Sequence, residues 1–297
     1  MSPRVEKEQE LKGIIVVNKP LGITSNNVVI KIKKILNEKK VGHLGTLDPL
    51  ASGVLPICVG KATRLFDLFL KKDKTYIAHF TFGETTPTLD RESDVNKTCD
   101  FIPTKDDLEN AIKSFFLGEI SQTPPIHSSK KIDGRSAYTY ARRGEEIALP
   151  PSLVTIYEFK VLSQIDDKTY EFLITCSSGT YIRSLARDLG KAVGSLATMS
   201  YLCRTRCGVF SLDNAIKLDD LSKESINDNM LPLEEVLNDF DPIEISQEIY
   251  TKIRNGINMP IENCPVDDKL HLVLCDKKAV GLGKFFENKL KITTYLD

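Results

Sequence analysis

The 297-residue sequence has no apolar run approaching the roughly 20 residues that a membrane-spanning helix needs. Its first 12 residues are polar and mixed in charge, and they lack the apolar stretch of a secretion signal. Both absences favour a cytoplasmic location. With 41% hydrophobic and 27% charged residues, the chain can bury a large core in one big domain or two unequal ones.

The seven cysteines form neither a disulfide framework nor a metal-binding pattern. Their number is odd and they are scattered along the chain, which is typical of reduced thiols. Cys203 and Cys207 make a C-x-x-x-C pair, but no histidine lies near them, whereas zinc sites usually combine two clustered pairs of ligands. The sequence therefore predicts no metal site.

Three common catalytic motifs are also missing. A phosphate-binding loop that ended at Gly60 and Lys61 would need glycine in place of Leu55 and serine or threonine in place of Ala62. No Rossmann fingerprint and no Gly-x-Ser-x-Gly elbow occurs. We therefore expect no nucleotide cofactor.

The net charge of −1 does not indicate a uniformly basic protein, but the charges are unevenly distributed. Residues 1–74 carry 14 basic and 7 acidic side chains, and residues 121–210 carry 12 and 8. The intervening segment 75–120 carries 4 and 9, and the tail 211–297 carries 10 and 17. If the two basic stretches meet in space, they form a face that binds polyanions. The alternative is ordinary solvated surface.

Apolar patterning predicts interleaved strands and helices that do not follow a strict βαβ order. In the clearest strand, 75–82, Tyr76, Ala78, Phe80 and Phe82 alternate with more polar residues. This interleaving favours an α+β fold with a mixed, mostly antiparallel central sheet and flanking helices. The other expected strands are 13–18, 54–59, 153–161 and 170–176. The expected helices are one that Thr24 or Ser25 caps and whose apolar stripe runs from Val28 to Leu36, followed by 62–70, 105–116 and 181–193.

Two segments are expected to stand apart from this core. Residues 122–152 contain two Pro-Pro pairs and many basic residues, and they are expected to form an insertion that stands off the core. After about residue 240 the sequence changes to short strands and turns, which predicts a small all-β module over 240–297. The predicted catalytic domain is therefore 1–239.

Residues 42–56 hold the densest group of turn-forming and functional residues. Three glycines permit sharp turns, and His43 and Asp48 are the strongly functional side chains. Pro49 biases Asp48 away from helical geometry, so that a stiff loop presents the carboxylate just before a strand. Taken alone, an Asp-Pro pair in a glycine-rich loop is most often a simple turn.

This stretch, followed by 60–64, resembles the signature of the bacterial tRNA pseudouridine synthase B family. Further blocks resemble that family's motifs in the family's order, over residues 13–210. The tail resembles the family's small PUA-like RNA-binding module more loosely. Thr198 departs from the pattern, because the family often has histidine there. The matching blocks are 17–25, 74–77, 83–90, 122–125, 128–130, 138, 141–144, 178–183, 188–190, 202–204 and 208–210.

The resemblance implies the pseudouridine synthase fold and an enzyme that isomerises the T-loop uridine of tRNA, position 55, after flipping it out of the stack. Asp48 is implied as the catalytic carboxylate. Arg183 is implied as the arginine that pairs with Asp48 and favours its ionised form. Tyr76 is implied to stack on the uracil. No metal or cofactor, no membrane and no obligate protein partner is implied, and we expect a monomer.

The resemblance also implies a set of RNA contacts. His43 is expected to help displace the target base and to fill its place in the stack, and Leu202 to pack on the uracil face opposite Tyr76. Lys19 and Lys61 are expected to meet phosphate or to support the active-site loops. The remaining RNA-binding candidates are Tyr181, Lys130, Arg142 and Arg143.

Two other functions stay open on the sequence alone. The first is a guide-RNA-dependent, dyskerin-like pseudouridine synthase, which shares the Gly-x-x-Gly-x-Leu-Asp-Pro core; the well-matched insertion and the modest length favour the stand-alone bacterial type. The second is a non-catalytic tRNA-folding chaperone. Joint retention of Asp48, Tyr76 and Arg183 speaks against the second alternative.

Overall fold

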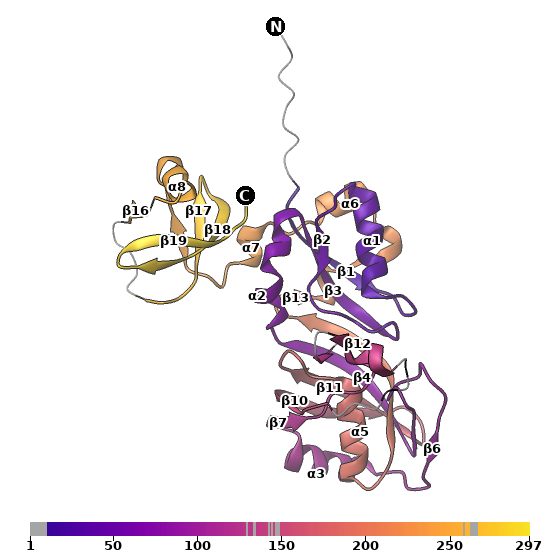
Figure 1. Ribbon diagram of the computed structural model, residues 1–297. Coiled ribbons are helices and arrows are strands. Elements are labelled where there is room, and N and C mark those ends of the chain that lie inside the picture. Colours follow the sequence, from indigo (N-terminus) through magenta and orange to yellow (C-terminus); the bar gives the residue numbers. More distant parts are fainter. Residues whose placement is uncertain are drawn as a thin grey trace.

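The computed structural model describes residues 11–128, 130–132, 135–141, 143, 145, 149–257, 259–261 and 267–297. Its centre is a ten-stranded sheet with the order β14-β1-β3-β12-β4-β11-β10-β7, in which β2 pairs with β3 and β13 with β12 (Figure 1). In the described part of the sheet, the pairs β1–β14 and β3–β12 are parallel and the others antiparallel. This confirms the predicted mixed, mostly antiparallel sheet. The strands are β1 (Gly13–Lys19), β2 (Val41–His43), β3 (Ala51–Val59), β4 (Lys74–Phe82), β7 (Gly118–Gln122), β10 (Ser152–Gln164), β11 (Thr169–Cys176), β12 (Ala197–Cys207), β13 (Phe210–Ser211) and β14 (Ile216–Lys217).

The sheet is buried on both faces at its β1–β3 end. Alternate side chains of β1 enter different cores: Ile15 and Val17 belong to one apolar cluster, and Ile14 and Val16 belong to another. This two-residue period follows from strand geometry. The first cluster also contains the inward-facing residues of β4, which are Tyr76, Ala78, Phe80 and Phe82. The prediction that these four side chains share one face of the strand is confirmed.

Three amphipathic helices cover the first face: α1 (Ser25–Leu36), α3 (Lys105–Phe115) and α5 (Ile182–Ala192). Thr24 starts α1 with a capping box, in which its hydroxyl accepts from the backbone N–H of Asn27 and the Asn27 side chain accepts in return. Among the described residues, no helix is both long and apolar enough to cross a membrane. The shorter elements are η1 (Gly60–Leu65), α2 (Phe66–Leu70), β5 (Glu84–Thr85), β6 (Lys97–Thr98), η2 (Leu212–Asn214), η3 (Leu218–Asp220), α6 (Lys223–Asp228) and α7 (Leu233–Val236).

The sequence did not predict β12, although it lies at the centre of the sheet between β3 and β4. Its eleven residues include Thr198, Arg204 and Arg206, so the apolar alternation of a central strand is weak. The pairing explains why those residues are tolerated: Thr198 and Arg204 are buried, and their polar atoms donate to backbone carbonyl oxygens.

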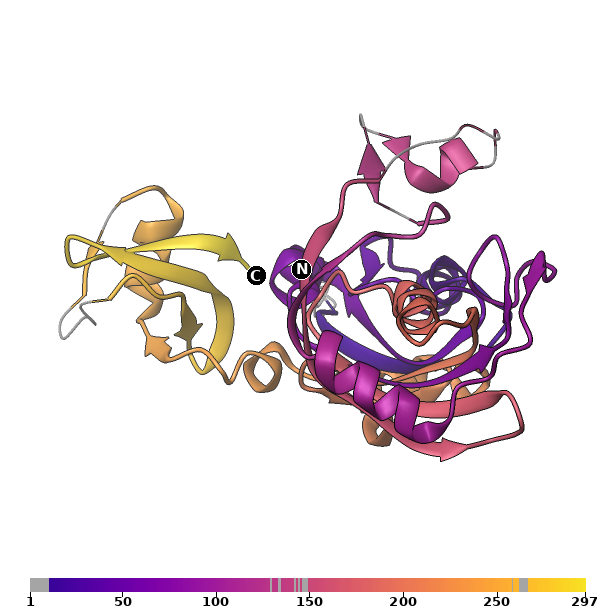
Figure 2. The ribbon, with the colours of Figure 1, turned by 90° about the horizontal axis from the view of Figure 1, so that it is seen from below.

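The predicted insertion stands off the core (Figure 2). Its described elements are β8 (Lys131–Ile132), β9 (Arg135–Ser136) and α4 (Ala137–Ala141). Lys130 joins the two ends of the insertion by hydrogen bonds. Its ammonium group donates to the carbonyl oxygen of Pro150 at 3.0 Å and to the hydroxyl of Ser152 at 2.6 Å.

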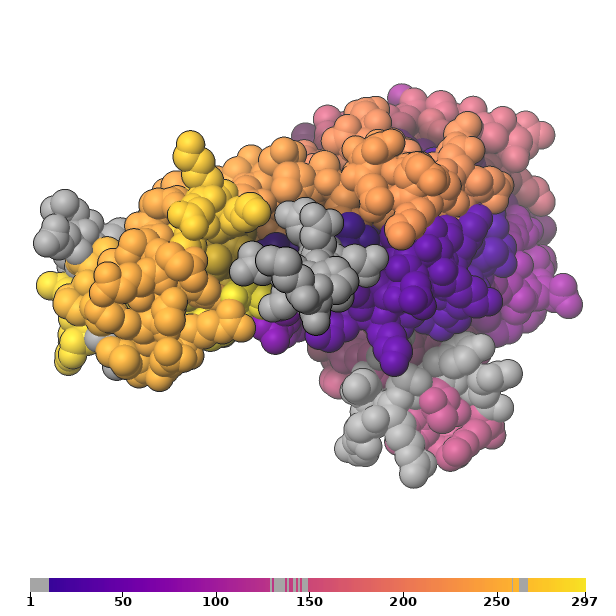
Figure 3. All heavy atoms as spheres, turned by 90° about the horizontal axis from the view of Figure 1, so that it is seen from above, coloured from indigo at the N-terminus to yellow at the C-terminus, as the bar shows by residue number. Residues whose placement is uncertain are grey.

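The C-terminal module forms a second sheet with the order β15-β17-β18-β19-β16 (Figure 1). The module lies beside the rest of the protein (Figure 3). Its strands are β15 (Pro242–Glu244), β16 (Met259–Pro260), β17 (His271–Cys275), β18 (Lys278–Phe286) and β19 (Lys289–Tyr295). The prediction of an all-β module is wrong, because α8 (Gln247–Arg254) packs Tyr250 and Ile253 against this sheet. Lys12 links the module to the body, since its ammonium group donates to the carbonyl oxygens of Ala279 and Leu296.

Candidate active site

A cavity of about 500 Å³ opens where the loop between β2 and β3 faces the start of α5. Its lining combines one polar cluster with aromatic and aliphatic surface, which is the composition of a ligand site rather than of a packing defect. The described lining residues are Thr24, Thr46, Leu47, Asp48, Pro49, Tyr76, Glu92, His127, Ser128, Thr180, Tyr181, Ile182, Arg183 and Leu202.

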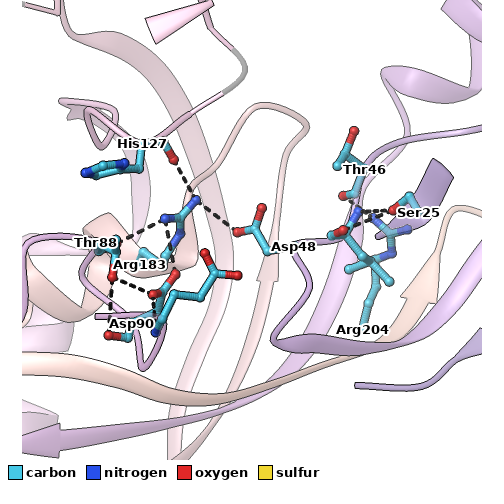
Figure 4. A network of polar contacts seen from close by, with 10 residues as sticks. Ser25, Thr46, Asp48, Thr88, Asp90, His127, Arg183 and Arg204 are labelled. Atoms are coloured by element: carbon cyan, nitrogen blue, oxygen red, sulfur yellow. Dashed lines mark hydrogen bonds and ion pairs between the residues drawn. The ribbon is translucent and has the colours of Figure 1, made fainter. Parts of the chain in front are cut away.

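Arg183 is the hub of the polar cluster (Figure 4). Its guanidinium Nη2 lies 3.0 Å from Oδ2 of Asp48, and its Nη1 lies 3.2 Å from Oδ2 of Asp90. The same two nitrogens donate to the carbonyl oxygens of Thr88 at 3.0 Å and His127 at 2.9 Å. The Arg183 side chain is 7% exposed, so these four acceptors fix it in one orientation. The planar fork of arginine suits such a role, which lysine could not fill.

Of the two carboxylates that pair with Arg183, Asp48 is the one that lines the cavity. Its side chain is 38% exposed, whereas that of Asp90 is 1% exposed. The backbone carbonyl of Asp48 accepts from the N–H of Ala51 at 3.0 Å, which closes the turn into β3. The predicted pairing of Asp48 with Arg183 is present.

Ser25 and Lys19 hold the loop that carries Asp48 through hydrogen bonds to its backbone. Ser25, at the start of α1, exchanges two hydrogen bonds with the backbone of Leu47, at 2.9 and 3.0 Å. Lys19 has no exposed surface, and its ammonium group donates to the carbonyl oxygens of Pro20, Ile23 and Pro49. Burial lowers the pKa of Lys19 to about 8, while the nearby Asp48 carboxylate opposes that shift.

Lys19 was expected either to meet phosphate or to support the active-site loops. A side chain with no exposed surface and three carbonyl partners is a loop support. The assignment of Lys19 as an RNA-binding residue is therefore corrected, because burying its ammonium group leaves no surface for a phosphate.

Tyr76 and Leu202 come from the neighbouring strands β4 and β12 and supply the apolar part of the cavity. Their side chains are 8% and 6% exposed. Burial raises the pKa of the Tyr76 phenol, and the Arg204 guanidinium acts in the opposite direction. The phenol is therefore neutral at physiological pH and can act as a hydrogen-bond donor.

Tyr181 lies at the N-terminal end of α5 and is fixed by a side chain from the base of the insertion. The Gln122 amide accepts from the backbone N–H of Tyr181 at 2.8 Å and donates to its carbonyl oxygen at 3.1 Å. Ser184 adds a third bond between α5 and the insertion, because its hydroxyl donates to the carbonyl oxygen of Thr123 at 2.9 Å. The insertion and the helix of Arg183 are thus joined.

The other predicted RNA contacts that the structure describes are not among the residues that line this cavity. His43 ends β2, outside the cavity lining, and burial followed by the Arg204 charge lowers its pKa. Lys61 is part of η1, and Lys130 closes the base of the insertion. Arg143 is exposed and lies 3.8 Å from Glu145, whereas Arg142 lies outside the described residues. Their contacts with RNA stay predictions.

Two residues of the site were missed as functional residues in the sequence. Asp90 ended a matching block but looked like one more polar residue of a surface loop. Arg204 also lay in a matching block, and nothing in its neighbours indicated that it would be fully buried beneath the Asp48 loop. Neither role could be predicted from neighbouring residues. Arg183, the ion-pair partner of Asp90, and the carbonyl groups that Arg204 binds all lie far away in sequence.

Comparison with known families agrees with this geometry. A family described as the N-terminal domain of TruB family pseudouridylate synthases matches residues 33–182, and the tRNA pseudouridylate synthase B C-terminal domain matches 183–243. The chain belongs to the TruB family of pseudouridylate synthases. The resemblance seen in the short sequence blocks is thereby confirmed, and this TruB family member is an isomerase.

Relatives of this TruB protein extend over nearly its whole length. The tRNA pseudouridine synthase B of Clostridium acetobutylicum is 39% identical over 290 residues, which cover 96% of this chain and 100% of the relative. That of Bacillus subtilis is 38% identical over 258 residues, covering 83% and 82%.

Solved structures give the same fold. A chain from an H/ACA RNP bound to a substrate RNA containing 2′-deoxyuridine aligns with a TM-score of 0.72 and 26% identity, over 96% of this chain and 85% of that one. A chain from a Cbf5-Nop10-Gar1 complex aligns with a TM-score of 0.71 and 28% identity, over 96% and 84%.

Proposed function

We propose that this TruB family member isomerises the T-loop uridine of tRNA, position 55, to pseudouridine, with Asp48 as the catalytic carboxylate. The observation that carries the proposal is the Asp48–Arg183 pair, 3.0 Å apart, in a cavity that also contains Tyr76 and Leu202. The names of the full-length relatives support tRNA as the substrate.

The reaction must break the bond from ribose C1′ to uracil N1, turn the base and form a bond from C1′ to C5. N1 gains a proton and C5 loses one, so that nothing is added or removed overall. Asp48 has the exposed carboxylate that can react with one fragment or stabilise it. The Tyr76 ring and the Leu202 side chain offer two apolar surfaces between which a flat base can be held.

A uridine in folded tRNA must leave its stack before Asp48 can reach it, at a cost of about a few kcal/mol. We assign this displacement to His43, as the resemblance implies. The insertion, with Lys130, Arg142 and Arg143, and the C-terminal module, 240–297, are proposed to grip the RNA, the latter as a PUA-like domain. Lys61 is proposed as a further phosphate contact. The enzyme is proposed to act in the cytoplasm, as a monomer and without a protein partner.

The guide-RNA-dependent alternative has a structural basis, because Cbf5-containing assemblies share the fold. The identity of 39% to a bacterial tRNA enzyme along the whole chain, against 26% to 28% for those chains, favours the stand-alone reading. Conversion of bare tRNA without guide RNA separates the two. A chaperone without catalysis would leave the uridine unchanged.

The test is incubation with an unmodified tRNA transcript, followed by chemical mapping of pseudouridine. Wild type is expected to convert the T-loop uridine, and Asp48→Asn to bind the same tRNA with little change and leave it unmodified. Asp94→Asn is the matched control, because it removes an exposed carboxylate close to the site segment that contains Asp90. Conversion by Asp48→Asn at the wild-type rate would refute the assignment of Asp48.

A further inference from the structure

Arg204 is a buried cation that the proposed chemistry does not use. It is 1% exposed and is one of the largest fully buried side chains of the described structure. Its Nε donates to the carbonyl oxygen of Val54 at 2.8 Å. The two terminal nitrogens reach the Asp48 loop, with Nη1 3.4 Å from the carbonyl oxygen of Thr46 and Nη2 3.2 Å from that of Gly45 (Figure 4).

These partners are unusual for an arginine in a protein interior. A buried charge is ordinarily paired with an opposite charge, because leaving water is costly. Within the described part of the chain, Arg204 instead satisfies its donors on backbone carbonyls, and no carboxylate forms an ion pair with it. Hydrogen bonds from a charged donor are stronger than neutral ones, so the three carbonyls are held firmly.

Two glycines of the 42–56 stretch, Gly45 and Gly53, lie beside residue 204 and have a positive φ. Gly53 has φ +102°, and a Cβ there would collide with the Arg204 carbonyl oxygen, because β3 and β12 pair at this point. Gly45 has φ +105°, a conformation that favours glycine, and its carbonyl oxygen accepts from Arg204 Nη2. Gly53 is therefore required by the close approach of the β12 backbone, and Gly45 by its own conformation at the carbonyl that Arg204 binds.

The loop is thus held by two buried cations on either side of the reacting carboxylate. Arg204 binds the carbonyls of Gly45 and Thr46, before Asp48, and Lys19 reaches the carbonyl of Pro49, after it. Arg204 also pairs with Tyr76 in the strand register of β12 and β4. Residue 204 therefore contacts the Asp48 loop through its side chain and lies opposite Tyr76 through the strand pairing.

We infer that Arg204 is a positioning residue for the isomerisation: by holding the backbone of Gly45 and Thr46, it sets where the Asp48 carboxylate stands relative to Arg183 and the bound base. This role rests on the proposed function of Asp48. Arg204 has no exposed surface in the cavity and touches no substrate, so it acts on the rate of the chemical step and not on RNA binding.

The test compares Arg204→Lys and Arg204→Met in single-turnover conversion of tRNA and in tRNA binding. Lysine keeps the charge but not the fork, and Lys19 shows that a buried lysine can be accommodated under this same loop. We expect the rate to fall about 10-fold in Arg204→Lys and about 100-fold in Arg204→Met, because a shift of about 1 Å in a reacting group can cost that much. The dissociation constant for tRNA is expected to stay within about threefold.

Leu237→Ala is the control for lost stability, because Leu237 is fully buried in the second apolar cluster and is not among the described residues that line the cavity. It is expected to lower the melting temperature while keeping the wild-type rate at a temperature where it is folded. Should Arg204→Met fail to fold, Gly45→Ala perturbs the acceptor instead of the donor and is expected to lower the rate with unchanged binding.

Wild-type rates in Arg204→Lys and Gly45→Ala would overturn the inference. The inference would also be overturned if Leu237→Ala and Arg204→Lys lost equal amounts of melting temperature and equal amounts of rate. The effect of Arg204 would then be explained by lost stability alone. Conversion by wild type and Leu237→Ala establishes the proposed function independently of either result.

Discussion

Replacing Asp90 with asparagine tests whether Arg183 must be held by a second carboxylate in order to orient Asp48. Asp90 is 1% exposed, and its Oδ2 contacts Arg183 while its Oδ1 accepts from the Thr88 hydroxyl at 2.6 Å and the Glu92 N–H at 2.9 Å. Asparagine has nearly the same shape and can keep both Oδ1 bonds. The substitution therefore removes one charge, replaces the Oδ2 acceptor of Arg183 with an amide donor, and keeps the Oδ1 bonds that hold the surrounding loop.

The magnitude follows from the partners that remain. Removing one member of a buried ion pair typically costs about 3–5 kcal/mol, because the other charge stays buried and uncompensated. Arg183 keeps Asp48 and the carbonyls of Thr88 and His127, so we expect a loss of about 2 kcal/mol, below that range. Without Asp90, the guanidinium is free to shift toward Asp48. A displacement of about 1 Å would lower the rate of isomerisation about 100-fold.

The assay is single-turnover conversion of unmodified tRNA, together with tRNA binding and urea unfolding. We expect the rate of Asp90→Asn to fall about 100-fold while the dissociation constant for tRNA stays within about threefold. Asp94→Asn, an exposed carboxylate in the same segment, should match wild type in all three measurements. A wild-type rate in Asp90→Asn would refute the reasoning, and so would a slow rate accompanied by an equal loss of tRNA binding.

Two further predictions concern stability. Because burial lowers the pKa of Lys19 to about 8, the unfolded chain holds more protons than the folded one between about pH 8 and pH 10.4, and stability rises with pH through that window. Lys19→Met should remove this rise, which is at most about 3 kcal/mol. The measurement is the free energy of unfolding in urea at pH 7.5, 9 and 10. If that free energy changed with pH in the same way for both proteins, the prediction would be contradicted. Gln122→Ala should cost about 2 kcal/mol, because it leaves both backbone groups of Tyr181 without the amide. If the free energy of unfolding in urea fell by less than about 0.5 kcal/mol, water would have to replace the Gln122 amide as the partner of Tyr181, and the prediction would be wrong.

The elements that follow a simple apolar period could be predicted from the sequence. Strand β4 alternates polar and apolar residues, and α1 combines an apolar stripe with a capping threonine at residue 24, so local pattern and tertiary burial agree. Strand β12 could not be predicted this way. It is buried because it pairs with β3 and β4 on its two sides. Its buried Arg204 donates to the carbonyl oxygen of Val54, which lies 150 residues earlier in the chain.

The site was only partly predictable for the same reason. Asp48, Arg183 and Tyr76 could be named from the family resemblance, and they lie around one cavity. What the sequence could not give was the burial of each charge. Lys19 carries the same side chain whether it faces phosphate or three carbonyl oxygens, and only the packing of the loop decides between them.

The gradient of burial across the polar cluster assigns different roles to its two carboxylates. Asp90 is 1% exposed, Arg183 is 7% exposed and Asp48 is 38% exposed, so the chain of contacts runs from the interior to the cavity. A carboxylate with almost no exposed surface cannot reach a substrate, but it can fix the guanidinium that orients Asp48, the proposed catalytic carboxylate. Removing the charge of Asp90 should therefore slow a reaction that still occurs, whereas removing that of Asp48 should abolish it. Equal effects of the two substitutions would mean that the cluster acts as a unit and that exposure does not decide which group reacts.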